Sequence, residues 1–184
     1  MSQSEQGAPG SVAIVVAVRD GARYLAEALE SALAQTRPAV EIVVVDDGSA
    51  DDSAEIARRV DGVRVICQAN AGLAAARNAG QQAVQSDYVV FLDHDDRLLP
   101  DNLAVNAGHL DAAPVLGFVG GRSVTIDEEG RRLRFVEDAD DPPSCTYESL
   151  LRGTAFVPPS TVMFRRAALE AIGGADPTMR DGAE

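Results

Sequence analysis

Four short runs, apolar except for Arg64 in the third, alternate with segments of helical periodicity, and this alternation limits the possible folds more than any other feature of the chain. The runs cover residues 12–18, 42–45, 63–67 and 88–92. An apolar run of strand length is typical of a strand buried on both faces, as in a parallel sheet covered by helices on both sides. We therefore predict a doubly wound α/β fold, with a mostly parallel central sheet and right-handed crossovers.

The segments between these runs have apolar residues at helical spacing, as at Leu25, Leu29 and Leu33. Asp20 is placed to cap the first helix, and Pro100 suits the first turn of the fourth. The predicted helices cover residues 25–33, 53–59, 74–85 and 100–111.

Beyond Ala113 the pattern is less regular. We expect one or two strands within 115–126, a turn at 127–130, strands at 133–136 and 161–164, a loop at 137–143, and helices at 146–152 and 165–172. Residues 1–10 are expected to be a disordered leader, and residues 11–184 a single domain. Within it, residues 11–113 are predicted to form a nucleotide-binding half and residues 114–184 the other wall of a cleft.

The composition excludes several classes of function. The chain has 16 basic and 29 acidic residues and a formal net charge of -13. This charge argues against binding to a nucleic acid or an anionic membrane surface, both of which need a basic face. It does not argue against a small phosphate ligand held through a metal, because carboxylates bind the metal. All 16 basic residues are arginine, so a Walker A loop and a Schiff-base lysine are excluded.

Histidine and cysteine are also scarce. His94 and His109 are too few for a multi-histidine zinc site. Cys67 and Cys145 are interpreted as small buried apolar residues in a reducing compartment. The first ten residues lack a secretory signal, and no apolar run approaches the roughly 18 residues of a membrane span. We therefore expect a cytoplasmic protein with no transmembrane segment in this chain.

Three carboxylates, Asp93, Asp95 and Asp96, crowd the end of the fourth apolar run. Carboxylates this close raise one another's pKa unless a cation is present. Their hard oxygens suit Mg²⁺ or Mn²⁺, which can take its remaining ligands from water and substrate phosphates. The alternative is a solvated acidic turn that leads into the next helix, and the spacing alone does not decide between the two.

A second acidic pair, Asp46 and Asp47, ends the second run. It either forms an Asx turn or accepts hydrogen bonds from a nucleoside base or ribose. Arg77 is either a helix-surface arginine, which its local sequence favours, or a cation facing a diphosphate. His94 alternates with the acidic residues along the strand and is expected to point away from them. In doubly wound sheets ligands bind beyond the carboxyl ends of the strands, where both acidic groups are expected.

Several motifs in order give the chain a family resemblance. They are Tyr24-Leu25, 31–36 (SALAQT), 41–49 (EIVVVDDGS), 70–72 (NAG), 76–78 (ARN) and 91–96 (FLDHDD). Together they resemble family 2 glycosyltransferases of the GT-A fold. Residues 159–166 (PSTVMFRR) and 173–177 (GGADP) resemble the acceptor-side region of that family more loosely.

The resemblance implies an enzyme that transfers a sugar from a nucleoside-diphosphate sugar to an acceptor hydroxyl with inversion at the anomeric carbon. Among the donors, a UDP-sugar is the one we expect. The acceptor would be a glycan or a lipid-linked molecule in cell-surface polysaccharide or glycolipid synthesis. The enzyme would use Mg²⁺ or Mn²⁺. It would be a cytoplasmic protein, either free or bound peripherally to the inner face of the membrane.

The resemblance also assigns residues. The nucleotide-sugar-binding residues that it implies are Asp46, Asp47, Arg77, Asn78 and Asp93. Asp93 and Asp95 would be the Asp-x-Asp motif, shared between the ribose and the metal, with Asp96 as a further metal ligand. The two clusters would thus serve the nucleoside and the diphosphate-bound metal.

The chain departs from the family at three places. Arg19 stands beside the expected nucleoside, and Ala175 replaces an aromatic residue after the paired glycines. In the family the general base is the Asp of a Glu-Asp pair. Glu184, the last residue of the sequence, aligns with the Glu of that pair, so the position of the base would be the next residue. Asp181 and Glu184 are weak substitutes for it. We therefore expect a truncated enzyme that binds the donor and transfers sugar poorly; the alternative is a non-catalytic nucleotide-sugar-binding module.

Overall fold

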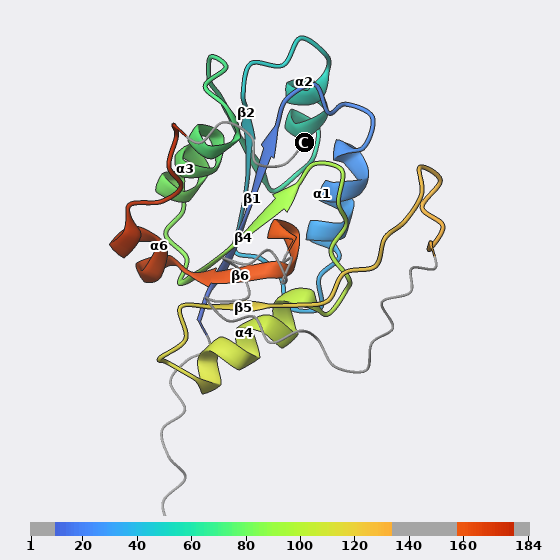
Figure 1. Cartoon of the computed structure of the whole chain (residues 1–184). Coiled ribbons are helices and arrows are strands. Elements are labelled where there is room, and N and C mark those ends of the chain that lie inside the picture. The colour runs from blue at the N-terminus through green and yellow to red at the C-terminus, as the bar shows by residue number, and fades with distance from the viewer. Residues whose placement is uncertain (1–9, 134–157, 179–184) are drawn as a thin grey trace, which may run out of the picture.

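The computed structural model describes residues 10–133 and 158–178, which form a six-stranded sheet with helices on both faces (Figure 1). The strand order is β3-β2-β1-β4-β6-β5. The strands are β1 (Val12–Val18), β2 (Glu41–Asp46), β3 (Val63–Cys67), β4 (Tyr88–Asp93), β5 (Phe118–Gly120) and β6 (Val162–Arg165). Strands β1 to β4 are mutually parallel, whereas β6 runs antiparallel to both β4 and β5. The prediction of a mostly parallel sheet is confirmed.

The helices cover the sheet in two layers. They are α1 (Leu25–Leu33), α2 (Ser53–Arg58), α3 (Leu73–Ala83), α4 (Asn102–Ala112), the 3-10 helix η1 (Pro159–Thr161) and α6 (Arg166–Ile172). Apolar residues of α1, α2 and α4 pack with one face of the strands, and those of α3 and α6 with the other. Figure 1 shows α3 and α6 on the opposite side of β1 from α1 and α2. No helix of the described ranges is long and apolar enough to cross a membrane.

The complete burial of β1 explains this arrangement. Every residue of β1 is buried. Ile14 and Val16 belong to one apolar cluster, whereas Ala13 and Val15 belong to the other. Because successive side chains of a strand point to opposite faces, a strand without polar residues has to be covered on both sides.

Of two predictions about local structure, one is confirmed and one is wrong. The span 115–126 supplies one strand, residues 118–120, and Ile126 makes an isolated bridge to Arg132. Asp20 does not cap α1, whose N-cap residue is Tyr24 without a side-chain hydrogen bond. Of the other expected segments, residues 1–9 of the leader, residues 134–136 of the strand expected at 133–136, the loop at 137–143 and the helix at 146–152 lie outside the described residues.

The strand order places a switch point between β1 and β4. The chain leaves β1 for β2 and β3 on one side and then returns to β4 on the other. Asp46 pairs in register with Val18 of β1, and Asp93 pairs with Ala17. At a strand spacing of about 4.8 Å, the two acidic strand ends lie about 10 Å apart across β1. Ligands of doubly wound sheets bind at such a switch point.

The helix α3 packs against the side chain of Val15 in β1 at Gly80, where there is no room for a Cβ. A Cβ at Gly80 would come within 2.2 Å of Val15 Cγ1. We expect Gly80→Ala to destabilise the fold by about 1–3 kcal/mol, because the helix or the strand has to shift. At Gly108, in the middle of α4, a Cβ meets nothing within 4 Å. Gly108→Ala should therefore stabilise by about 0.5–1 kcal/mol through helix propensity. Urea denaturation of both variants measures these opposite signs, and equal signs would contradict this account.

The amino-terminal ends of β1 and β4 are joined by Asp87. Its Oδ2 accepts hydrogen bonds from the backbone N–H of Ser11 at 2.7 Å and from the Ser11 hydroxyl at 2.8 Å. The backbone hydrogen bond first, and then the hydroxyl, lower the pKa of Asp87 below its usual 3.8. A depressed pKa in the folded state means that the unfolded chain takes up the proton first.

We therefore expect Asp87 to stabilise the fold above its ordinary pKa and to lose this effect as the pH falls through its folded-state pKa. Asp87→Asn should lower the free energy of unfolding at pH 7 and flatten its decline below pH ~4. Asp61→Asn is the control, because the Asp61 carboxylate makes no hydrogen bond within the described ranges. Urea titrations at several acidic pH values measure both variants, and equal slopes for Asp87→Asn and the wild type would contradict the prediction.

Candidate functional site

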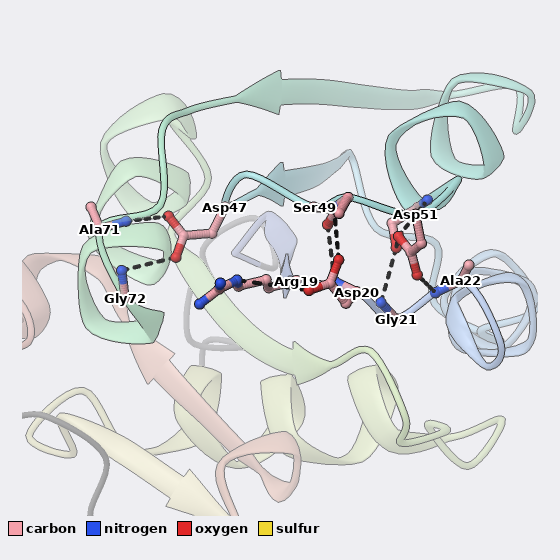
Figure 2. A network of polar contacts seen from close by, with 11 residues as sticks. Arg19, Asp20, Gly21, Ala22, Asp47, Ser49, Asp51, Ala71 and Gly72 are labelled. Atoms are coloured by element: carbon pink, nitrogen blue, oxygen red, sulfur yellow. Dashed lines mark hydrogen bonds and ion pairs between the residues drawn. The ribbon is translucent and has the colours of Figure 1, made fainter.

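Asp47 follows β2 and holds the loop that leads into α3. It is 4% exposed. Its Oδ1 accepts hydrogen bonds from the Gln68 side-chain amide at 2.7 Å and the backbone N–H of Ala71 at 2.8 Å, and its Oδ2 accepts one from the N–H of Gly72 at 2.8 Å. Figure 2 shows the carboxylate facing these two backbone groups. Because Gly72 is the N-cap of α3, Asp47 fixes the start of that helix.

Asp46, the last residue of β2, is buried with an unsatisfied oxygen. It is 5% exposed, and its Oδ1 has no hydrogen-bond partner within the described residues. A buried carboxylate oxygen without a donor has lost its hydration without compensation. Protein atoms enclose this oxygen, so a donor group of a ligand or a water molecule can satisfy it only when neighbouring atoms move.

The turn before α2 is made by Asp51, so the Asx turn considered for Asp46 and Asp47 is not formed. Asp51 Oδ1 accepts from the backbone N–H of Ser53 at 3.0 Å and its hydroxyl at 2.5 Å, and Oδ2 accepts from the N–H of Ala22 at 2.9 Å. The Ser53 hydroxyl is the largest influence on the pKa of Asp51, which is lowered although burial opposes it. The loop after β1 is thereby tied to the start of α2 (Figure 2).

Asp20 strengthens the same connection instead of capping α1. Its backbone adopts a φ of 51°, its N–H donates to the Ser49 hydroxyl at 3.0 Å, and its Oδ1 accepts from the N–H of Ala50 at 2.7 Å. Arg19 is half-exposed, with its Nε 3.8 Å from Asp20 Oδ2. In Figure 2 the Arg19 side chain extends along this edge from Asp20 toward Asp47.

Arg77 connects α3 to the end of β4. Its Nη2 donates to Asp93 Oδ1 at 2.6 Å, and the two side chains are 19% and 28% exposed. The guanidinium carbon lies 6.0 Å from the centre of the Phe91 ring. Arg77 Nε is buried and has no partner in the part of the chain that the structure describes. The interpretation of Arg77 as a surface arginine, which the local sequence favoured, is therefore wrong.

The acidic turn after β4 gives each carboxylate a different environment. Asp93 is paired with Arg77, and the Asp96 Oδ2 accepts a hydrogen bond from the Ser160 hydroxyl at 2.5 Å. Burial raises the pKa of Asp96, and the neighbouring charges of Asp93 and Asp95 raise it further, although Ser160 opposes them. Asp95 is exposed and forms no ion pair or hydrogen bond within residues 10–133 and 158–178.

These residues fit a divalent cation that is shared with a phosphate ligand. In the described residues, no three His, Cys, Asp or Glu side chains come together closely enough to hold a metal ion. Mg²⁺ or Mn²⁺ needs only one or two protein carboxylates when phosphates and water supply its other ligands. Asp95 is the carboxylate with free oxygens, and Asp93 stands beside it. Ser160 already donates a hydrogen bond to one oxygen of Asp96, which leaves the other oxygen for a metal ion. The role of Asp96 as a metal ligand stays a prediction.

The other predicted site residues have separate surroundings. The Asn78 amide donates to the carbonyl of Ala175 at 2.7 Å and accepts from its N–H at 2.8 Å, so it holds the segment after α6. His94 packs on Gly21, where a Cβ would lie 2.2 Å from the His94 Cδ2 atom. Asp181 and Glu184 lie outside the described residues.

The expectation of buried cysteines is wrong for Cys67, which is exposed and accepts a hydrogen bond from Arg58 Nη2 at 3.0 Å. It ends the edge strand β3, whose outer side is not covered by another strand of the described residues. Cys145 lies outside the described residues.

One hollow borders the acidic turn, and another lies beside Arg77. A cavity of about 190 Å³ is lined by Tyr24, Glu27, Asp95, Asp96, Arg97 and residues 126–128. An apolar groove of about 380 Å³ begins at Arg77 and continues between Phe91, Phe118, Phe164 and Leu169. The pair of Arg77 and Asp93 therefore stands next to the groove, while Asp95 and Asp96 border the cavity.

The fold and these side chains define a doubly wound α/β protein with acidic residues at the switch point of its sheet, which is where such sheets bind their ligands. The sequence profile described as Glycosyl transferase family 2 matches residues 11–173. The chain therefore belongs to glycosyl transferase family 2, and the predicted family is confirmed.

Two relatives show how similar this chain is to curated proteins of the family and how much of their length it covers. An uncharacterized glycosyltransferase of Nostoc sp. is 33% identical over 182 residues, which cover 90% of this chain and 54% of the relative. The succinoglycan biosynthesis protein ExoO of Rhizobium meliloti is 38% identical over 132 residues, which cover 70% of this chain and 38% of ExoO. The chain thus spans about half the length of the first relative and less of the second.

Solved structures confirm the GT-A type of fold. S. aureus TarS, residues 1–349, has a TM-score of 0.71 at 22% identity over 94% of this chain and 52% of that chain, and it has also been solved with UDP and with UDP-GlcNAc. The mannosyltransferase PcManGT of Pyrobaculum calidifontis, in complex with GDP-Man and Mn²⁺, has a TM-score of 0.67 at 21% identity over 95% of this chain and 50% of that chain.

Proposed function

We propose that this chain binds a nucleoside-diphosphate sugar at the switch point and serves its transfer to an acceptor hydroxyl. The observation that supports this most is the physical link between the two acidic strand ends. Asp47 fixes the start of α3, and Arg77 of the same helix pairs with Asp93. One rigid helix thus sets the position of the nucleoside-side carboxylates relative to the diphosphate side.

We propose a UDP-sugar as the donor, with a hexose as the transferred group. TarS binds UDP and UDP-GlcNAc, and PcManGT binds GDP-Man, so the base is the part of the donor that needs a direct test. In our proposal Asp46 accepts a hydrogen bond from the nucleoside through its unpartnered oxygen, while Asp47 shapes the loop beneath it. Arg77 faces the diphosphate, and Asn78 contributes by holding the neighbouring segment.

Asp95, with Asp93, would hold Mg²⁺ or Mn²⁺ together with the diphosphate oxygens, and Asp96 completes the acidic turn. The cation would neutralise charge that develops on the leaving diphosphate. The chain's own residues position the donor: Arg77 holds the Asp93 carboxylate, and the hydrogen bonds of Asp47 keep the loop at residues 68–72 in place. The complex of PcManGT with Mn²⁺ supports a divalent cation at such a site.

In the proposed reaction the acceptor oxygen forms a bond to the anomeric carbon while the bond from that carbon to the diphosphate breaks. The acceptor's proton passes to a carboxylate base on the opposite face, and the configuration inverts. Asp181 and Glu184 stay weak candidates for this base. The inverting course rests on the family resemblance, and NMR of the product anomer would test it.

The acceptor is proposed to be a glycan or a lipid-linked molecule in polysaccharide or glycolipid synthesis. ExoO, named for succinoglycan biosynthesis, supports the polysaccharide context. Residues 11–113 are proposed as the donor half. Residues 114–184 are proposed as the acceptor-side half, because the apolar groove beside Arg77 is built partly from this second region. A cytoplasmic or membrane-peripheral place stays a prediction.

Calorimetric titration of the 184-residue chain with UDP, GDP and ADP, each with and without Mn²⁺, tests the proposal. We expect one nucleotide to bind and Mn²⁺ to strengthen its binding. Absence of binding by all three would overturn the proposal. Release of the nucleoside diphosphate from the matching sugar donor in the presence of an acceptor then separates an enzyme from a module that only binds.

A further inference from the structure

Ser160 bridges the two ends of the acidic turn, although it comes from a distant part of the chain. It lies in η1 and is 6% exposed. Its Oγ accepts a hydrogen bond from the backbone N–H of Asp93 at 3.1 Å and donates one to Asp96 Oδ2 at 2.5 Å. The backbone N–H of Asp96 donates to the carbonyl of Asp93 at 3.1 Å. The three hydrogen bonds close a ring around the turn.

We propose that Ser160 is a positioning residue, which orients the acidic turn so that Asp95 presents its carboxylate to a cation bound with a nucleoside diphosphate. This inference rests on the proposed function. The Ser160 hydroxyl has one proton, which is donated to Asp96, and it accepts the N–H of Asp93. One buried hydroxyl therefore holds the backbone of Asp93 before Asp95 and the side chain of Asp96 after it.

The geometry explains why the exposed Asp95 needs such support. Asp95 has no hydrogen bond or ion pair within the described ranges that would orient it, so its place depends on the flanking residues. Asp93 is held from one side by Arg77 and through its N–H by Ser160, and Asp96 is held by Ser160. Groups that orient metal ligands typically contribute a factor of about 10 to 100 in metal affinity.

The segment that provides Ser160 is itself well anchored. The strand β6 follows η1 directly and pairs with β4 through Val90 and Met163, and Met163 is fully buried. This pairing sets η1 against the carboxyl end of β4. The cation-binding edge thus depends on a contact between residues more than sixty positions apart in the sequence, as the separation of 64 between Asp96 and Ser160 shows.

Ser160→Ala tests the proposal. We expect it to weaken Mn²⁺ binding in the presence of saturating UDP by about 10- to 100-fold. Binding of UDP without Mn²⁺ should change little. Ser160→Thr keeps a hydroxyl and should restore most of the Mn²⁺ affinity. Mn²⁺ binding is followed by electron paramagnetic resonance far below the melting temperature of each variant, with GDP in a parallel series.

Thr161→Val is the matched control. Thr161 is also buried in η1, but its hydroxyl donates to the carbonyl of Pro158 at 2.7 Å and does not touch the acidic turn. We expect its Mn²⁺ affinity to equal that of the wild type. Equal Mn²⁺ affinities of Ser160→Ala and the wild type would overturn the inference alone. Failure of the wild type to bind Mn²⁺ with either nucleotide would overturn the metal-assisted function, and the inference with it.

Discussion

Replacement of Asp95 by asparagine should remove the effect of Mn²⁺ on nucleotide binding without a loss of stability. Asp95 is exposed and makes no hydrogen bond or ion pair in the described residues, so the fold loses nothing when its charge is removed. The proposed cation, however, loses the carboxylate with free oxygens. We expect Mn²⁺ affinity in the presence of UDP to fall by at least the ~100-fold at the upper end for residues that only orient metal ligands.

Glu128→Gln separates ligation from general electrostatics in this experiment. Glu128 lines the same cavity as Asp95 and is also exposed, but it pairs with Arg23 at 2.7 Å. Its replacement removes the same charge from the same cavity. We expect only a small change in Mn²⁺ affinity for Glu128→Gln. If both variants weaken Mn²⁺ binding equally, Asp95 acts through its charge alone and the proposed ligand role is wrong.

Replacement of Asp47 by alanine should have the largest combined effect on stability and binding. The variant leaves the Gln68 amide and two backbone N–H groups without their acceptor and frees the loop before α3. We expect the free energy of unfolding to fall by about 2–4 kcal/mol, since hydrogen bonds to a charged group are strong and unsatisfied donors are costly. Urea denaturation measures this change.

Nucleotide binding should also be lost in Asp47→Ala at temperatures where the variant is folded, because α3 and Arg77 are displaced from their places. Asp47→Asn is a sharper test, since its amide would bring a donor against one of the donors that now bind the carboxylate. Asp52→Ala is the control, as this exposed neighbour makes no side-chain hydrogen bond at the N-cap of α2. Normal nucleotide binding by Asp47→Ala would contradict the role given to the loop.

Much of the fold was predictable because its information is local. A strand without polar residues, such as β1, has to be buried on both faces, and this requirement alone implies a sheet between helix layers. The strand bounds of 12–18 and 63–67 agree with the structure. The later strands were less predictable: β5 has only three residues, and its position depends on pairing with β6 rather than on its own sequence.

The candidate site also has residues that were predictable from the sequence and residues that were not. The carboxylates at the ends of β2 and β4 were identifiable, because residues that follow apolar strands gather at one edge of a parallel sheet. Ser160 was missed as a functional residue, since nothing in its local sequence indicates a contact with Asp93 and Asp96. Asp20 was assigned a capping role from its place before a helix, whereas it bonds to the loop after β2.

The sequence by itself thus determined the layered fold, the family and the edge of the sheet at which the acidic residues gather, because apolar periodicity and strand-end residues are local properties. Only the tertiary structure decided how each carboxylate is used. Asp47 holds a loop, Asp93 pairs with an arginine, and Asp96 accepts from a serine, which leaves Asp95 available for a cation. These roles depend on partners 16 to 64 positions away, and no local pattern fixes which partner reaches which oxygen.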